Sequence, residues 1–180
     1  GTIQVAGIDV IEEPRRSHRA LGYLSDSFGL YDALSVRRSL GYVARANGVE
    51  TAAVDRVVTD IGAALGLTER LDQPAGQLSR GLRQRLAIAQ AIIHSPAVVI
   101  LDEPASGLDP EARFSLGQLF LDLRRRGMTL LVSSHILAEL EAYSSHMLIL
   151  RDGRVVEHRA LSGAPAAVAT IEIETAEESP

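Results

Sequence analysis

The chain has 180 residues, of which 46% are hydrophobic and 23% charged, a composition typical of a globular domain with a sizeable core. It contains no cysteine, which excludes a disulfide scaffold, a thiolate metal site and a cysteine nucleophile. The net charge of −5 argues against non-specific binding to nucleic acid. All 18 basic residues are arginines, so these residues cannot supply a catalytic lysine or the lysine of a P-loop. The apolar runs are far shorter than the roughly 20 residues of a membrane span.

The N-terminal half is predicted to begin with short strands and to continue into helices. Thr2–Val5 alternates in the manner of a strand, Gly7 marks a turn, and Ala20–Leu24 has the composition of a short strand. From Gly29 to Gly76 the apolar residues recur at helical spacing instead. We therefore expect a small helical subdomain that is inserted into an α/β body.

The C-terminal half alternates predicted helices and strands, which is the pattern of an α/β fold. Ser79 is placed to cap one helix, and Asp109 followed by Pro110 is placed to begin the next. The strands that follow these helices are continuous apolar runs, as expected for strands buried on both faces of a parallel sheet. In chain order the expected elements are the helix Gly81–His94, the strand Ala97–Leu101, a helix from Pro110 to about Arg126, the strand Met128–Val132, the helix Ile136–Ser144, the strand Met147–Leu150, and a tight turn at Asp152-Gly153 leading into Arg154–Glu157.

The first candidate site is Val98–Pro104, where an apolar strand ends in two adjacent carboxylates. Open parallel sheets bind ligands at the carboxyl ends of their strands. Asp102 there suits a hard cation such as Mg²⁺, and Glu103 is placed to activate a water molecule. Two surface acids that cap a loop would explain this motif equally well.

The second candidate site is Leu78–Arg85, at the predicted start of a helix. Ser79 and Gly81 leave backbone N–H groups accessible at the positive end of the helix dipole, which is an anion-binding arrangement. Taken alone, the segment is explained more simply as a well-capped helix with three solvated arginines.

The third candidate site is Val132–His135, which also follows a predicted strand. His135 could donate a hydrogen bond to a phosphate oxygen or orient a carboxylate, although a lone histidine after a strand is usually structural. The remaining histidines have no such setting and are interpreted as surface or packing residues: His18, His94, His146 and His158.

The order of these motifs resembles the nucleotide-binding domain of ABC-type ATPases. The chain carries an LSxGxxQR segment, an apolar strand with LDEP, the sequence SGLDP and a strand that ends in SSH, in that order. The resemblance extends from Gly1 to about Glu157. It implies an α/β fold with an incomplete P-loop NTPase-like core and an inserted helical subdomain.

By this resemblance the strand ends would carry the chemistry of ATP hydrolysis. Asp102 would support Mg²⁺, Glu103 would be the general base, and His135 would sense the γ-phosphate. Catalysis would consist of positioning and electrostatic stabilisation. The three candidate sites would converge on one triphosphate pocket, whose other wall these residues do not encode.

The resemblance also implies two kinds of protein partner. Ser79, Gly81 and Gln84 would clamp ATP held by the opposite subunit of a head-to-tail homodimer or heterodimer, and the loop Ser106–Asp109 would cross to that subunit. A membrane permease, contacted near Asp26–Leu34, would hold the chain at the cytoplasmic face of the membrane. The sequence FGLYDALSV resembles ATPase subunits of two-component exporters.

Two features depart from the family pattern. The P-loop GxxxxGK[ST], the strand before it and the adenine-stacking aromatic residue are absent, so the chain resembles the C-terminal part of a cassette. We expect it to lack ATPase activity alone and to expose strand edges that favour oligomers or marginal stability. Asp26 occupies the place of a family glutamine; it could still contact Mg²⁺ and nucleotide, but a carboxylate cannot donate a hydrogen bond.

The resemblance divides the chain into four parts. These are residues 1–28, a remnant of the N-terminal β region with the glutamine-loop equivalent; 29–80, the helical subdomain; 81–159, the α/β core; and 160–180, a C-terminal tail. The implied function is the ATP-binding and ATP-hydrolysing subunit of an ABC transporter of the exporter type. Two alternatives are a non-catalytic ABC-like interaction or regulatory module and a soluble ABC ATPase outside transport.

Overall fold

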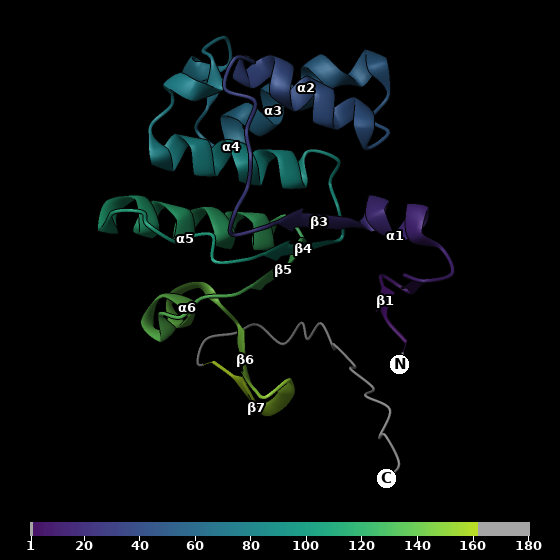
Figure 1. Ribbon diagram of the computed structural model, residues 1–180, viewed down its shortest axis with the longest axis vertical. Coiled ribbons are helices and arrows are strands. Elements are labelled where there is room, and N and C mark those ends of the chain that lie inside the picture. The colour runs from purple at the N-terminus through teal and green to yellow at the C-terminus, as the bar shows by residue number, and fades with distance from the viewer. Residues whose placement is uncertain (1, 162–180) are drawn as a thin grey trace.

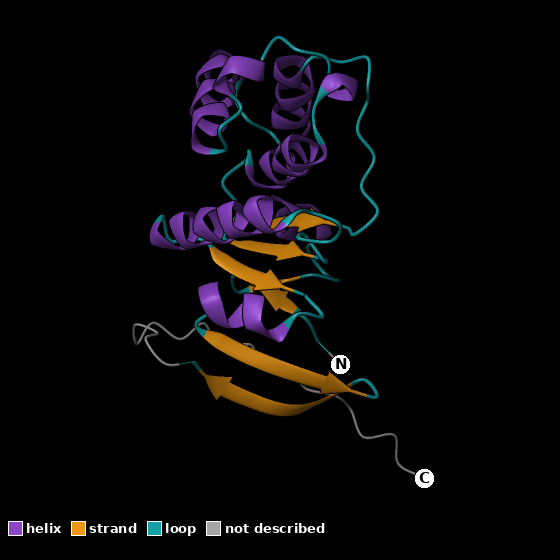
Figure 2. Ribbon diagram, turned by 90° about the vertical axis from the view of Figure 1, so that its left-hand side faces the viewer, coloured by secondary structure: helices purple, strands orange, loops and turns teal. Residues whose placement is uncertain are grey.

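The computed structural model describes residues 2–161, which form three parts stacked along the longest axis of the molecule (Figure 1). A group of helices lies at one end, a parallel sheet with its covering helices lies in the middle, and a β-hairpin lies at the other end. Figure 2 shows the long helix α5 lying between the helical group and the strands of the central sheet.

The central sheet contains β3 (Leu21–Leu24), β4 (Val98–Leu101) and β5 (Thr129–Val132), in that order. Both pairings are parallel, as predicted, and the three strands end in register, with Leu101 opposite Leu24 on one side and Val132 on the other. The residues that follow the three strands are therefore brought to one edge of the sheet.

Helices α4 (Arg80–Ile92) and α5 (Pro110–Arg125) pack on one face of this sheet, and the hydrophobic core formed there continues into the helical group. Leu24, Val99 and Leu101 on that face are buried, and Gly22 contacts the backbone of α4 so closely that no side chain would fit. The predicted caps are confirmed: Ser79 accepts a hydrogen bond at the start of α4, and Asp109 does so at the start of α5.

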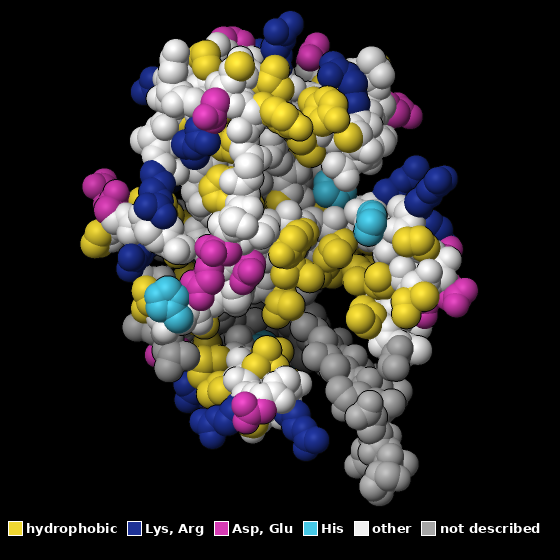
Figure 3. All heavy atoms as spheres, in the orientation of Figure 1, with side chains coloured by type: hydrophobic (Ala, Val, Ile, Leu, Met, Phe, Trp, Pro, Cys, Tyr) yellow, Lys and Arg dark blue, Asp and Glu magenta, His cyan; other side chains and the backbone are white. Residues whose placement is uncertain are grey.

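The opposite face of the sheet is partly open, so the expectation of strands buried on both faces was wrong. Tyr23 is 59% exposed and Leu131 is 40% exposed, and the register places both beside the half-buried Ile100. Figure 3 shows hydrophobic side chains gathered over this middle part of the molecule. An apolar run identifies a strand but cannot show whether a second layer covers it.

This open face leads us to expect that the isolated 180-residue chain self-associates, because exposed apolar surface of this kind favours contact between copies. Replacing Tyr23 and Leu131 together by glutamine should raise the monomer fraction in size-exclusion chromatography with light scattering. Tyr42→Gln is the control, since Tyr42 is 63% exposed on a helix far from the sheet. A parent chain that is monomeric at all accessible concentrations would contradict this expectation.

The N-terminal segment forms a small hairpin and a helix. β1 (Gln4–Val5) pairs antiparallel with β2 (Ile8–Asp9), so the predicted strand is shorter than Thr2–Val5 but has its turn at Gly7, as expected. Helix α1 (Pro14–Ala20) follows and was missed by the sequence analysis.

The helical group is built by α2, α3, α4 and short 3-10 turns. Ser35 caps α2, with its Oγ accepting a hydrogen bond from the backbone N–H of Arg38 at 3.3 Å. Arg37 forms two hydrogen bonds with Asp72, and this guanidinium lowers the pKa of the exposed Asp72 carboxyl. The elements are α2 (Val36–Ala46), η1 (Thr51–Ala53), α3 (Val54–Ala64), η2 (Thr68–Arg70) and η3 (Ala75–Gln77).

The C-terminal part contains α6 (Leu137–Tyr143) and an antiparallel hairpin of β6 (His146–Arg151) and β7 (Arg154–Ala160). The predicted turn between the two strands is confirmed, since Asp152 and Gly153 both have positive φ. The predicted C-terminal tail lies, from residue 162 onward, outside the described residues. No helix within residues 2–161 combines the length and the hydropathy that a membrane crossing requires.

His94 is a packing residue, as interpreted from the sequence. Its Nε2 lies 3.2 Å from the backbone oxygen of Leu21, whereas its buried Nδ1 has no hydrogen-bond partner in the described structure. Burial lowers the pKa of His94 below its ordinary value, because the charged imidazolium loses its hydration; the contact with Leu21 acts in the opposite direction and is smaller.

This shift predicts a loss of stability in acid. The unfolded chain binds the extra proton more readily than the folded chain, so stability should fall as the pH drops below about 6.5. Thermal unfolding measured between neutral and mildly acidic pH should show a smaller decline in His94→Gln, whose amide can still donate to Leu21. The exposed His18→Gln is the control; equal pH dependence in all three proteins would show that His94 is not responsible.

Candidate functional site

The carboxyl ends of the three parallel strands converge at one edge of the central sheet. The backbone N–H of Asp102 donates to Leu24 at 2.9 Å, and the N–H of Ser133 donates to Leu101 at 3.0 Å. The hydrogen-bonding ladder therefore continues one residue beyond each strand pair. It fixes Asp102 and Ser133 beside each other, although they are 31 positions apart in the sequence.

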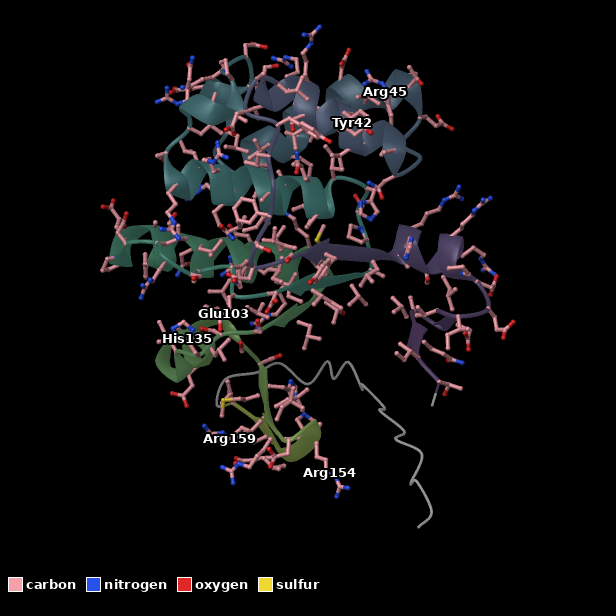
Figure 4. The ribbon with its side chains drawn as sticks, in the orientation of Figure 1. Tyr42, Arg45, Glu103, His135, Arg154 and Arg159 are labelled. Carbon is pink, nitrogen blue, oxygen red and sulfur yellow. The ribbon has the colours of Figure 1, made fainter. Side chains whose placement is uncertain are left out.

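Four residues from the ends of β4 and β5 form a connected cluster. The Ser133 hydroxyl donates to Oδ1 of Asp102 at 2.6 Å and accepts a hydrogen bond from the backbone N–H of Glu103 at 2.9 Å. Nδ1 of His135 lies 2.9 Å from Oε2 of Glu103, and Figure 4 shows these two side chains next to each other. His135 therefore contacts a carboxylate, and orienting a carboxylate is one of the two roles that the sequence leaves open for it.

The side chains of Glu103 and His135 differ in their exposure to solvent. The Glu103 side chain is 28% exposed and the His135 side chain is 71% exposed. Glu103 also has a left-handed backbone conformation, with φ of 45°, which few residues other than glycine adopt. Strained conformations of this kind are retained when the surrounding contacts hold them, and they are found frequently at functional sites.

Asp26 follows β3 and lies at the same edge of the sheet. It is exposed, and its side chain makes no hydrogen bond or ion pair within the part of the chain that the structure describes. The structure thus places Asp26 near the strand ends without linking it to the Asp102 cluster.

The cluster offers oxygen atoms, which are the ligands that Mg²⁺ prefers. One oxygen of Asp102 is taken by Ser133, which leaves the other oxygen available to a cation. Residues 2–161 contain no group of three or more acidic or histidine side chains that could hold a metal alone. Mg²⁺ is usually bound by one or two carboxylates together with substrate phosphates and water, so this donor set fits a magnesium–nucleotide complex.

A separate pocket lies at the start of α4. It has a volume of about 340 Å³, and its lining includes three predicted clamp residues, Ser79, Gly81 and Gln84. Gly81 faces Ala112 of α5, whose own start is capped by Asp109 through a hydrogen bond of 2.8 Å.

The acidic cluster does not contribute to this pocket, which contradicts the expectation that all three candidate sites converge. The pocket is lined by the starts of α4 and α5, by Gly66 and by Leu108. Neither Asp102, Glu103 nor His135 lines it. Within this chain the clamp residues and the acidic strand end are therefore two sites that lie on different elements.

The arginines of the Leu78–Arg85 segment are not simply solvated. Arg80 donates to the backbone oxygen of Ser106 at 3.4 Å, and thereby ties the start of α4 to the loop Ser106–Asp109. Arg83 bonds to Asp32 at 2.7 Å.

Arg85 joins two parts of the molecule. Its guanidinium donates to the Leu65 carbonyl at 2.9 Å and to the Ser115 hydroxyl at 2.5 Å, so it connects the helical group to α5. Gly66 permits this approach, since a Cβ at that position would lie 2.9 Å from the guanidinium. Sequence reasoning missed these contacts because they depend on the packing of segments far apart in the chain.

The chain resembles known proteins in both sequence and fold. A family model described as "ABC transporter" matches residues 1–106. The chain is 38% identical over 154 residues to the ATP-binding cassette sub-family A member 7 of Rattus norvegicus, covering 86% of this chain and 7% of that protein. It is 31% identical over 162 residues to the ABC transporter ATP-binding protein NatA of Bacillus subtilis, covering 89% and 66%.

Further similarities extend over most of the chain. The Nod factor export ATP-binding protein I of Burkholderia orbicola is 31% identical over 173 residues, covering 96% of this chain and 56% of that protein. A solved structure of the ATP-binding subunit of an ABC transporter superposes with a TM-score of 0.73 at 30% identity, covering 86% of this chain and 65% of that one. The chain thus spans less than two thirds of the length of these relatives.

Proposed function

This chain belongs to the ABC transporter ATP-binding family and has its P-loop NTPase fold, and we propose that its acidic strand ends form the hydrolytic edge of an ATPase subunit. The observation that carries this proposal is the cluster at the ends of β4 and β5, in which Glu103 contacts His135 and Asp102 contacts Ser133. If Asp102 and Glu103 were only surface acids that cap a loop, they would not need contacts with residues at the end of a second strand.

The proposed mechanism assigns separate tasks to three side chains of the cluster. Glu103 accepts a proton from the attacking water and aligns that water with the γ-phosphate. His135 holds Glu103 in position through Nδ1 and turns its other ring nitrogen toward the phosphate. Asp102 would hold Mg²⁺ with the oxygen that does not contact Ser133, and the ion would supply positive charge next to the phosphates.

The position of the clamp residues supports a head-to-tail dimer. Ser79, Gly81 and Gln84 line a pocket that does not include the acidic cluster, and the exposed Ser79 could contact ATP held by a second subunit there, whereas the Gln84 side chain is buried in the wall of the pocket. Asp109 and the loop Ser106–Asp109, which Arg80 ties to α4, would lie beside that contact. The partner is an identical subunit or a related one.

Asp26 would contact the Mg²⁺–ATP complex from the end of β3. Its carboxylate can accept hydrogen bonds from water or interact with the cation, but it cannot donate a hydrogen bond as the family glutamine can.

We also propose that the chain is organised in four parts, which are residues 1–28, 29–80, 81–159 and 160–180.

Export is the transport direction that the relatives support. One relative is a Nod factor export ATP-binding protein, which is 31% identical to this chain over 173 residues. We propose that this chain likewise drives a membrane permease as an exporter subunit, and that it reaches the cytoplasmic face of the membrane through that permease.

These 180 residues contain no lysine and no GxxxxGK[ST], so the phosphate-binding loop must come from elsewhere for hydrolysis to occur. We expect the chain alone to show no Mg²⁺-dependent release of phosphate from ATP. Preceding it with the strand, P-loop and helix of a relative such as NatA gives what we call the completed domain, which should hydrolyse ATP.

The absence of lysine also favours a second candidate, a non-catalytic module that offers its clamp residues to a complete subunit. The same assay separates the two. An inactive but folded completed domain would support the module and contradict the ATPase; hydrolysis by the chain alone would contradict the requirement for an added P-loop.

A further inference from the structure

Ser133 lies between Asp102 and Glu103, and its hydroxyl contacts both residues. It follows β5 directly, and its backbone N–H is anchored to Leu101 of β4 at 3.0 Å. The hydroxyl is therefore presented from a rigid part of the sheet and not from a free loop. Rigid elements position functional groups more accurately than loops do.

One hydroxyl group makes both contacts, and its chemistry allows this arrangement. The single proton of the Ser133 hydroxyl is directed to Oδ1 of Asp102 at 2.6 Å, a distance typical of a hydrogen bond to a charged acceptor. A lone pair of the same oxygen accepts the N–H of Glu103 at 2.9 Å. The hydroxyl thus acts as a donor to the side chain of Asp102 and as an acceptor from the backbone of Glu103.

The contact with Glu103 acts at a strained point of the backbone. Glu103 has a φ of 45°, and its N–H is the group that Ser133 holds. The same residue contacts His135 through its carboxylate at 2.9 Å. Releasing the N–H would allow Glu103 to relax to an ordinary conformation, which would turn its carboxylate away from His135.

We propose that Ser133 is a positioning residue for the hydrolytic edge: it sets the direction of the Glu103 carboxylate and leaves one defined oxygen of Asp102 for the cation. This inference rests on the proposed ATPase function, but its geometric part can be tested without activity. Ser133 acts through Asp102 and Glu103 and does not itself touch the substrate.

The neighbouring Ser134 provides a matched control. Its Oγ accepts a hydrogen bond from the backbone N–H of Ile136 at 3.1 Å. Ser134 therefore supports the turn before α6 and makes no contact with either carboxylate in the described structure. Ser133→Ala and Ser134→Ala remove the same atom from adjacent residues and differ in what that atom touches.

The geometric test uses the 180-residue chain labelled with ¹³Cε1-histidine, in which five resonances are expected. The His135 resonance is assigned with His135→Gln. Glu103→Gln should shift this resonance in the parent, in Ser133→Thr and in Ser134→Ala, because the contact with Glu103 is intact in all three. In Ser133→Ala, by contrast, Glu103→Gln should not shift the His135 resonance. An equal response in Ser133→Ala and Ser134→Ala would overturn the proposal.

The functional test uses the completed domain. We expect Ser133→Ala to lower kcat by about tenfold to a hundredfold, since a displacement near 1 Å at a reacting group has an effect of this size. Ser133→Thr should restore most of the loss, and Ser134→Ala should have little effect.

Glu103→Gln in the same assay distinguishes a failure of the positioning role of Ser133 from a failure of the proposed ATPase function. If it abolishes hydrolysis while Ser133→Ala leaves kcat unchanged, the positioning role is wrong and the proposed function stands. If Glu103→Gln leaves hydrolysis intact, the proposed function itself fails, and the histidine resonances then decide the geometric claim alone.

Discussion

Gly22→Ala is expected to destabilise the chain by about 3 kcal/mol, at the upper end of the range for overpacked cores. A Cβ at Gly22 would lie 2.3 Å from the backbone oxygen of Ala91 and 3.1 Å from Pro96. The first of these atoms belongs to the backbone of α4 and cannot rotate away. The strand β3 and the helix α4 would have to separate, which would open the core that lies beneath the site.

Denaturant unfolding followed by circular dichroism would measure this loss, with Gly29→Ala as the control. Gly29 has no positive φ, and a Cβ there would meet no atom within 4 Å, so its substitution should change the unfolding midpoint very little. A loss in Gly22→Ala no larger than in Gly29→Ala would mean that β3 and α4 are not packed as described.

Glu103→Gln in the completed domain should reduce kcat for ATP hydrolysis by at least about a hundredfold, which is the lower part of the range for a general base. The amide keeps the size of the side chain but cannot accept the proton of the attacking water. Binding of ATP should be retained, because the phosphates are held by the P-loop and by Mg²⁺, not by Glu103.

Phosphate release under saturating Mg²⁺–ATP would give kcat, and Glu111→Gln would serve as the control. Glu111 is an exposed acid in the first turn of α5, so its substitution changes the net charge equally without touching the cluster. Retention of more than about a tenth of the parent kcat in Glu103→Gln would remove Glu103 from the role of base.

Much of the fold could be predicted from the sequence because its signals are local. Ser79 and Asp109 cap helices through atoms only three residues away, and the turn at Asp152-Gly153 requires residues that tolerate positive φ. Helix α1 was missed because its residues are mostly polar and show no apolar periodicity. The open face at Tyr23 was missed because exposure depends on what lies opposite a strand.

The candidate site could likewise be predicted only where its signals are local. Asp102, Glu103 and His135 could be named from motifs at predicted strand ends, where open sheets bind ligands. The part played by Ser133 could not, because it depends on the register that sets β5 beside β4. The links made by Arg85 depend similarly on how the helical group packs against α5.

The location of the nucleotide is tested most directly by adding Mn²⁺–ATP to the completed domain labelled with ¹³Cε1-histidine. Mn²⁺ replaces Mg²⁺ and broadens nearby resonances. His135 lies beside the acidic cluster, whereas His94 contacts Leu21 at the opposite end of β3. We expect the His135 resonance to broaden first and most, and the His94 resonance to broaden less. Broadening of His94 ahead of His135, or of neither at saturating nucleotide, would contradict it.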